Sequence, residues 1–251
     1  MPLKLYGVPL SQPWRSVCFA LLNKRVPFKA VVTVPGIASK FGARSEEFLA
    51  KAPLGTVPVV EEEDGLVLWE SPAILQYLAE SRKWEDLYPS SAAGRAKINA
   101  FMHWHHTGTR ELAYTLTPFF RPDMGVVTDE LFASRRAGAA KTLETFGSVW
   151  LDGGNSSFIG GAPTASIADL LAYGEVAQML PQYCNALPGI TLPDGVAGWC
   201  ERMQALPGHD ATHASLAALG DVTVPNEVAM DKRMGAATKA GLQAIAKAQE
   251  V

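Results

Sequence analysis

Residues 10–17 read Leu10-Ser11-Gln12-Pro13-Trp14-Arg15-Ser16-Val17, and this stretch decides how the fold begins. An apolar, strand-like run at residues 3–8 precedes it, and apolar residues at helical spacing follow it. Pro13 suits the first position of a helix, so the order strand, turn and helix is predicted. Ser11 then stands at a helix N-terminus, where unpaired amides and the helix dipole favour an anion. An ordinary helix cap is the other interpretation of this serine.

A proline interrupts the next apolar, β-branched run, Gly55–Val60. Pro58 cannot donate a hydrogen bond to a sheet, so it needs a special backbone role. We predict a cis Val57–Pro58 peptide bond at the entry of a strand. The dipeptide Asp64-Gly65 then predicts a hairpin that leads into the apolar run ending at Trp69.

A second helix start follows this hairpin at Glu70-Ser71-Pro72. Ser71 is expected to be the N-cap, with Pro72 at the first helical position. This predicts a second helix N-terminus that favours an anion, with the acid Glu70 beside it.

Length and periodicity indicate two domains. With 251 residues, 48% of them hydrophobic, the chain can bury a large core. Residues 82–91 are polar and broken by Pro89, which is typical of a linker. Beyond them the apolar period is helical, and helices are predicted at residues 92–117, 128–151, 166–180, 195–206 and 209–219. The expected fold class is α/β plus all-α.

Composition argues against several classes of function. A net charge of −3 without a basic stretch disfavours nucleic acid as a partner, and no apolar run is long enough to span a membrane. The three cysteines are too scattered for a disulfide framework or a zinc site, so a reducing cytoplasmic location is expected. His103 and His106 share a helix face but lack a third ligand, so no metal is expected.

The order of these elements resembles the thioredoxin-like domain of the soluble glutathione transferases. The residues from Ser11 to Arg15 match the Ser-x-Pro-x-Arg pattern of the serine-using classes, theta or delta. The run Ser166-Ile167-Ala168-Asp169-Leu170 also matches the capping box that these enzymes carry in their helical domain. The resemblance extends from residue 1 to about residue 220.

The resemblance implies the domain organisation. It assigns an N-terminal thioredoxin-like glutathione-binding domain to residues 1–81, a linker to 82–91 and a C-terminal helical bundle to 92–222. The extension, residues 223–251, is expected to form a helix over the active site, although Gly235 and Gly241 weaken its helical pattern. A mobile surface tail is the alternative.

The resemblance also implies how the chain binds glutathione. Ser71 and its helix-start amide would hold the γ-glutamyl carboxylate, and Glu70 would meet the ammonium group. The backbone of Val57, shaped by Pro58, would pair with the cysteinyl amide as an added strand.

The glycyl carboxylate of glutathione lacks its usual partner. Serine-type relatives present a histidine or a cation in the loop before this strand, but the chain has Ala43 where the histidine is expected. Lys40 or Arg44 must substitute, and Arg44 is preferred because a guanidinium can bind a carboxylate in a bidentate manner.

Ser11 is the expected catalytic residue. Its hydroxyl would donate to the sulfur of glutathione and favour the thiolate, so it is an electrostatic activator and not a covalent nucleophile. Arg15 would add positive potential or tie the domains together. Ser16 is the rival hydroxyl, but it lies inside the helix and is expected to bond to a carbonyl. Cys18 lies about two turns too late for a redox cysteine at the helix start and is expected in the core.

The electrophile would lie against the helical domain. There Trp104, Arg110 and Tyr114 are expected to line its site, although aromatic residues at helical spacing are also typical of a core. The predicted activity is conjugation of glutathione to small hydrophobic electrophiles and reduction of organic hydroperoxides, with glutathione as co-substrate and no cofactor, in a homodimer. The alternatives are a non-catalytic ligand-binding protein and a protein-interaction module on the same fold.

Overall fold

The protein is described by a computed structural model that places residues 2–120 and 128–250. The N-terminal part holds a four-stranded sheet in the order β2-β1-β3-β4. Strands β1 and β2 are parallel, and β3 runs antiparallel to both of its neighbours, β1 and β4. The strands are β1 (Leu3–Gly7), β2 (Phe28–Val32), β3 (Val59–Glu61) and β4 (Val67–Trp69).

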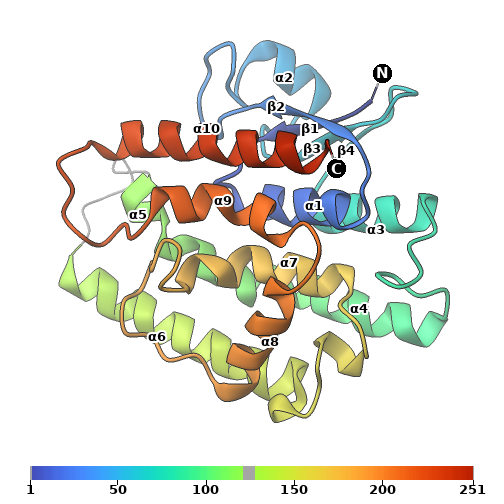
Figure 1. The fold of residues 1–251 in the computed structure, drawn as a ribbon, viewed down its shortest axis with the longest axis vertical. Helices are drawn as coiled ribbons and strands as arrows, with labels where there is room; N and C mark the ends of the chain where they lie inside the picture. Colours follow the sequence, from blue (N-terminus) through green and yellow to red (C-terminus); the bar gives the residue numbers. More distant parts are fainter. Residues whose placement is uncertain (1, 121–127, 251) are drawn as a thin grey trace.

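Three helices accompany the sheet. Helices α1 and α3 lie between the sheet and the helical part of the chain, and α2 lies on the opposite side of the sheet (Figure 1). The predicted hairpin is confirmed, and so is the cis peptide bond between Val57 and Pro58. The helices are α1 (Gln12–Asn23), α2 (Glu46–Lys51) and α3 (Ser71–Ser81).

The rest of the described chain is helical, so the predicted order of an α/β part followed by an all-α part is confirmed. The capping box is confirmed as well, because the Asp169 carboxylate accepts a hydrogen bond from the Ser166 backbone N–H at 2.8 Å. The helices are α4 (Ala92–His105), α5 (Thr117–Phe120), α6 (Asp129–Thr145), α7 (Ile167–Val176), α8 (Asp194–Gln204) and α9 (His209–Leu219).

The helix predicted at residues 92–117 is wrong in its second half. The α-helix ends at His105, and Thr109–Thr115 form a 3-10 helix instead. Gly108 lies against the Trp104 ring, where an added Cβ would come within 2.4 Å of the Trp104 Cε2 atom. The chain leaves the helix at this contact, which a periodicity pattern does not register.

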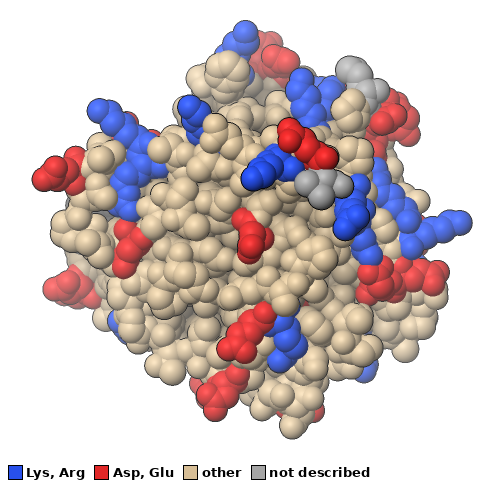
Figure 2. Space-filling view, in the orientation of Figure 1, with Lys and Arg blue, Asp and Glu red and all other residues tan. Residues whose placement is uncertain are grey.

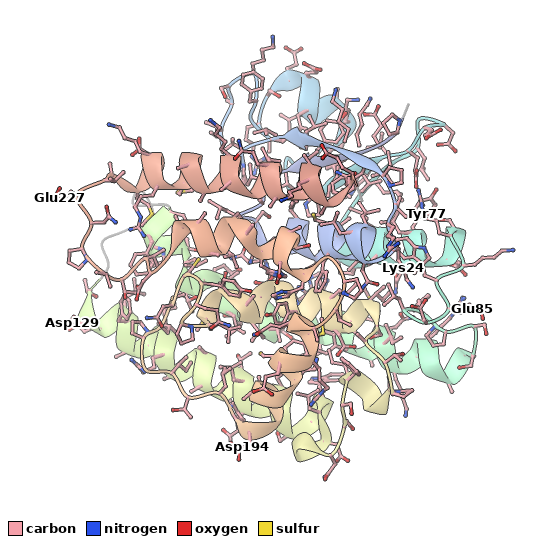
Figure 3. The ribbon with its side chains drawn as sticks, in the orientation of Figure 1. Lys24, Tyr77, Glu85, Asp129, Asp194 and Glu227 are labelled. Carbon is pink, nitrogen blue, oxygen red and sulfur yellow. The ribbon has the colours of Figure 1, made fainter. Side chains whose placement is uncertain are left out.

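Within the C-terminal extension, Met230–Ala248 form helix α10. Helix α10 runs alongside α9 and crosses from the side of α5 toward the sheet (Figure 1). Figure 3 labels Glu227 in the connection before α10 and Asp129 at the start of α6, both on the side of the molecule from which α10 departs. At the other end of α10, the Gln249 side-chain oxygen accepts a hydrogen bond from the Phe28 N–H of β2 at 2.8 Å.

The surface carries charges of both signs. On the face drawn in Figure 2, Lys and Arg side chains alternate with Asp and Glu side chains toward the margin, and the described residues there form no continuous basic stripe. None of the described helices combines the length and the apolar character needed to cross a membrane.

A buried aromatic cluster joins α1, α7 and α9. The His213 ring stacks on His209 with 4.6 Å between centroids, and it meets the rings of Tyr173 at 5.0 Å and Phe19 at 5.5 Å. The His213 Nδ1–H donates to the His209 carbonyl at 2.9 Å. Burial, reinforced by the nearby charge of Arg15, lowers the pKa of His213 well below its usual value.

This cluster predicts acid sensitivity. Below about pH 6.5 the unfolded chain gains a proton on His213 that the folded chain refuses, so the free energy of unfolding should fall by up to about 1.4 kcal/mol per pH unit for this group. Replacing His213 with Gln should reduce that slope between pH 6.5 and 5. Urea unfolding at several pH values measures it. His103→Gln, at an exposed position of α4, is the control; equal slopes in both variants would contradict the assignment.

Candidate active site

Four connections of the chain meet at one end of the sheet. Gly7 of β1 pairs with Val32 of β2, and Val59 of β3 lies between Tyr6 of β1 and Trp69 of β4. The ends of β1, β2 and β4 and the start of β3 are therefore neighbours. This end of an open sheet is where ligands bind in many α/β proteins. All predicted glutathione-binding residues lie in these connections: Ser11, Lys40, Arg44, Val57, Pro58, Glu70 and Ser71.

Ser11 stands at the N-terminus of α1 and does not cap it. Its backbone is extended, with φ −76° and ψ 123°, and its carbonyl accepts the first helical bond from the Arg15 N–H at 3.0 Å. Its side chain makes no hydrogen bond to the backbone of the helix. Ser11 thus occupies the N-cap position without a side-chain cap bond, and its half-buried hydroxyl is available to a ligand beside the unpaired helical amides.

The loop before Ser11 is held by a buried cation. Arg15 is fully buried, and its Nη1 donates to the Leu10 carbonyl at 2.8 Å and to the Pro9 carbonyl at 3.3 Å. Its Nη2 donates to the Gly174 carbonyl of α7 at 2.7 Å. Burial lowers the pKa of Arg15 to about 10, which still leaves the guanidinium charged at neutral pH. Arg15 thus ties the sheet domain to the helical domain and places a positive charge one turn from Ser11.

The rival groups on α1 are occupied. The Ser16 hydroxyl donates to the Gln12 carbonyl at 3.3 Å, as predicted for a serine inside a helix. Cys18 is fully buried, and this burial raises the pKa of its thiol. Neither side chain is in a state to act on a ligand.

The second helix start differs by one residue from the prediction. Ser71 is the first residue of α3 and not its N-cap; the N-cap is Glu70, whose carbonyl accepts from the Ile74 N–H at 2.9 Å. Glu70 adopts φ 68° and ψ 108°, a conformation that costs a residue with a Cβ about 1–3 kcal/mol. Strain of this kind concentrates where a side chain must face a ligand. Glu70 is exposed, and the Ser71 side chain is buried against the start of the helix.

Arg44 is better placed than Lys40. Both are exposed cations of the connection between β2 and α2. Gly55 adopts φ 61°, and a Cβ built there would lie 3.0 Å from both the Cδ and the Nη1 atoms of Arg44. The Arg44 side chain therefore lies across the connection that leads to Val57, which favours Arg44 as the partner of a carboxylate at this end of the sheet.

Arg110 joins the helical domain to the same end of the sheet. Its Nη1 donates to the Glu175 Oε1 atom at 2.7 Å, and Glu175 on α7 is almost fully buried. The charge of Glu175 raises the pKa of Arg110, and the charge of Glu70 adds to this effect. The Arg110 side chain is one-third exposed, so it presents a cation on the Glu70 side of the domain boundary.

The other two predicted electrophile residues make different contacts. The Trp104 ring packs against Phe101 and Trp150, with centroids 5.7 and 5.4 Å apart, inside the helical domain. The Tyr114 ring is exposed and lies 5.4 Å from the Arg135 guanidinium. The structure therefore brings Arg110 toward the predicted glutathione residues and gives Trp104 a role in packing.

The sequence did not predict two polar residues near the site: Glu175 in α7 and Gln178 in the turn that follows α7. Glu175 bonds to Arg110, and Gln178 joins Gln12, the neighbour of Ser11, through a hydrogen bond of 2.7 Å. The sequence carries a signal for these two residues, because Glu175 and Gln178 interrupt an otherwise apolar run that extends from Leu170 to Leu180. A charge in a fully buried helix needs a partner, so such a residue marks a contact between elements.

Away from this end of the sheet, the described surface has hollows but no cluster of metal-binding side chains. Among residues 2–120 and 128–250, no group of three or more His, Cys, Asp and Glu side chains could hold a metal ion. Two hollows lie away from the sheet end and contain none of the predicted site residues. One is lined by Glu62, Glu63, Asp64, Tyr77, Ser81 and Arg82, and the other by Gly153, Gly154, Asp194, Gly195, Gly198 and Arg202.

Comparison with known proteins gives consistent matches. Residues 5–84 match the family described as "Glutathione S-transferase, N-terminal domain". Glutathione S-transferase T1 of Arabidopsis thaliana is 32% identical over 97% of this chain and 98% of its own length. Glutathione S-transferase theta-1 of Mus musculus is 30% identical over 84% of this chain and 85% of its own length.

Solved structures of glutathione transferases share this fold. Human glutathione transferase theta-2, solved in complex with glutathione and an unknown ligand, superposes with a TM-score of 0.76 at 26% identity, and the match covers 98% of this chain and 99% of that one. The predicted resemblance, including its theta-class character, is confirmed.

The geometry predicts which cation meets the glycyl carboxylate. Arg44→Ala should raise the KM for glutathione on the order of tenfold, because a hydrogen bond to a charged group is lost. Lys40→Ala removes an exposed cation of the same loop and should leave this KM unchanged. Steady-state kinetics with varied glutathione measures both values, and the reverse result would assign the role to Lys40.

Proposed function

This chain belongs to the glutathione S-transferase family, and we propose that it activates the thiol of glutathione with the Ser11 hydroxyl for transfer to a small hydrophobic electrophile. The observation that carries the proposal is the position of the Ser11 hydroxyl and its lack of a cap hydrogen bond. This hydroxyl stands at the N-terminus of α1, makes no cap bond, and follows a loop fixed by Arg15.

We propose that glutathione lies across the end of the sheet. Its γ-glutamyl carboxylate would meet Ser71 and the start of α3, and its ammonium group would meet the exposed carboxylate of Glu70. The backbone of Val57 would pair with the cysteinyl amide, and Arg44 would bind the glycyl carboxylate. In support, Arg44, Val57 and Glu70 lie in connections at one end of the sheet, and Ser71 is the first residue of the helix that follows Glu70.

This placement brings the sulfur to Ser11. A thiol ordinarily has a pKa of about 8.5, and only the thiolate is a good nucleophile. The Ser11 hydroxyl, the amides of α1 and the charge of Arg15 all favour the anion, so thiolate should accumulate near neutral pH. Ser11 keeps its own proton throughout. The thiolate forms a bond to the electrophilic carbon, and the leaving group departs with its electron pair.

The same thiolate would reduce organic hydroperoxides. Its attack on the terminal peroxide oxygen breaks the O–O bond and releases an alcohol once the alkoxide takes up a proton. A second glutathione then displaces the sulfur-bound hydroxyl, which gives glutathione disulfide and water. No cofactor is needed for either reaction.

We propose further that the protein is a cytoplasmic homodimer. The edge strand β4 and the turn before it expose Leu66 (39%) and Trp69 (37%), which is apolar surface that a second copy would cover. All three cysteines are free and buried, which suits a reducing compartment.

The predicted domain limits, 1–81, 82–91 and 92–222, stay proposals. So does the covering role of the extension at 223–251. In support of a cover, Met230 and Met234 in the first half of α10 pack against the core, and α10 contacts α5.

Ser11→Ala tests the mechanism. The variant should fold and bind glutathione, because the other contacts lie elsewhere, but the bound thiol should titrate at a higher pH. The rate of conjugation should fall about 10²- to 10³-fold, as for other donors aimed at a developing anion. Thiolate absorbance against pH and turnover with an electrophile measure these effects.

Ser16→Ala and Cys18→Ala are the matched controls on the same helix, and both should cost much less than Ser11→Ala. A wild-type thiol no more acidic than free glutathione would refute the activation. Loss of activity only in Cys18→Ala would place the protein among redox enzymes.

Glu70→Ala and Ser71→Ala test the binding site. Because both side chains would contact groups remote from the sulfur, each substitution should raise the KM for glutathione more than it lowers kcat. The expected loss is about 1.5–3 kcal/mol of binding free energy for a charge-assisted contact. Titration calorimetry with glutathione measures it, and unchanged affinity in both variants would overturn this part of the site.

A further inference from the structure

Pro9, two residues before Ser11, is held from two helices. It is buried, and its carbonyl accepts hydrogen bonds from the Arg15 Nη1 at 3.3 Å and from the Ser215 hydroxyl of α9 at 3.1 Å. The loop that ends at Ser11 therefore depends on a side chain more than 200 residues away in sequence.

Helix α10 touches the same proline at Gly241. A Cβ built on Gly241 would lie 3.0 Å from the Pro9 Cβ and 2.8 Å from the Ser215 Cβ. Real Cβ atoms essentially never come as close as 2.8 Å, and a distance of 3.0 Å is tighter than most real Cβ contacts, so a side chain here would have to shift Ser215 and press on Pro9. Glycine is what lets α10 lie this close to both residues.

The same helix carries a glycine with no such contact. A Cβ on Gly235 would meet nothing within 4 Å, and Gly235 is exposed. Each glycine costs the helix about 1 kcal/mol relative to alanine. At Gly241 the close packing against Pro9 and Ser215 offsets that cost, whereas at Gly235 no close contact requires a glycine.

Helix α10 is anchored on both sides of Gly241. Toward its start, the Arg233 Nη2 donates to the carbonyls of Leu219 and Asp221, each at 2.8 Å. Toward its end, Ile245 is buried and Gln249 bonds to β2. With both ends fixed, the whole helix cannot easily move away, so an added methyl group at Gly241 would press on Ser215 and Pro9.

We propose that Gly241 and Ser215 are positioning residues for Ser11, so that α10 and α9 set the acidity of the bound thiol by fixing the Pro9 loop. This inference rests on the proposed role of Ser11. It gives α10 a part in activating glutathione that is separate from any cover over the electrophile. Neither residue touches the sulfur; both act through Pro9.

The test uses Gly241→Ala and Ser215→Ala in the full chain, with Gly235→Ala as the matched control. Both glycine variants gain the same helix propensity, so the contacts with Ser215 and Pro9 are what distinguish them. The readout is the pH titration of thiolate absorbance with bound glutathione, together with kcat and KM. In Gly241→Ala the pKa of the bound thiol should rise by about 0.5–1, which lowers the ratio of thiolate to thiol about three- to tenfold at any given pH.

The KM for glutathione should change little in Gly241→Ala, because the binding contacts lie in other loops. Ser215→Ala should shift the pKa of the thiol in the same direction by a smaller amount. This variant removes only a hydroxyl, so it keeps the test decisive if Gly241→Ala does not fold. Gly235→Ala should titrate as the wild type does.

Several results would overturn the inference. One is a wild-type titration curve in every Gly241 and Ser215 variant that folds. Another is a shift of equal size in Gly235→Ala, and a third is a change confined to the KM for the electrophile. A wild-type bound thiol as weakly acidic as free glutathione would instead refute the proposed role of Ser11, which distinguishes the two failures.

Discussion

The structure depends on one buried guanidinium. Among residues 2–120 and 128–250 no carboxylate bonds to Arg15, and three carbonyls, those of Pro9, Leu10 and Gly174, accept its hydrogen bonds. Burying a cation in this way is costly unless such dipoles replace its water. Two of the carbonyls belong to the loop that ends at Ser11 and the third belongs to α7, so the same bonds that compensate the charge also fix the loop on the helical domain. Removing the cation would release both at once.

The next residue of α7, Glu175, fixes a second arginine, Arg110. Glu175 follows Gly174 directly, and it holds Arg110 by a bond of 2.7 Å. One turn of a buried helix thus fixes the loop of Ser11 through Gly174 and the Arg110 guanidinium through Glu175. Gly174 permits this because α1 and α7 are nearly in contact there; an added Cβ would lie 2.4 Å from the Ser16 hydroxyl. Close packing between α1 and α7 therefore helps to set the relative position of Ser11 and Arg110.

The sequence predicted the parts of the site that local chemistry determines. Proline and serine at a helix start marked Ser11, a proline in a β-branched run marked the cis bond, and Asp64-Gly65 marked the hairpin. It did not predict that Glu70, and not Ser71, is the N-cap of α3. A positive φ at an acidic residue leaves no local sequence pattern, because the sheet and α3 impose that conformation. Nor did it predict the end of α4 at His105, which follows from the contact between Trp104 and Gly108. These failures share a cause, since each depends on a neighbour that periodicity does not register.

The two glycines of α10 show where such reasoning stops. From propensity alone, Gly235 and Gly241 are equivalent, and both weaken the helix. In the structure they differ completely, because one faces open space and the other lies between Pro9 and Ser215. The same residue type therefore has a local cost at both positions and a compensating contact at only one. A constraint between residues 9 and 241 arises only when the chain is folded, and it bears on the loop that ends at Ser11. Under the proposed mechanism, helix α10 is therefore part of the environment that sets the acidity of the bound thiol.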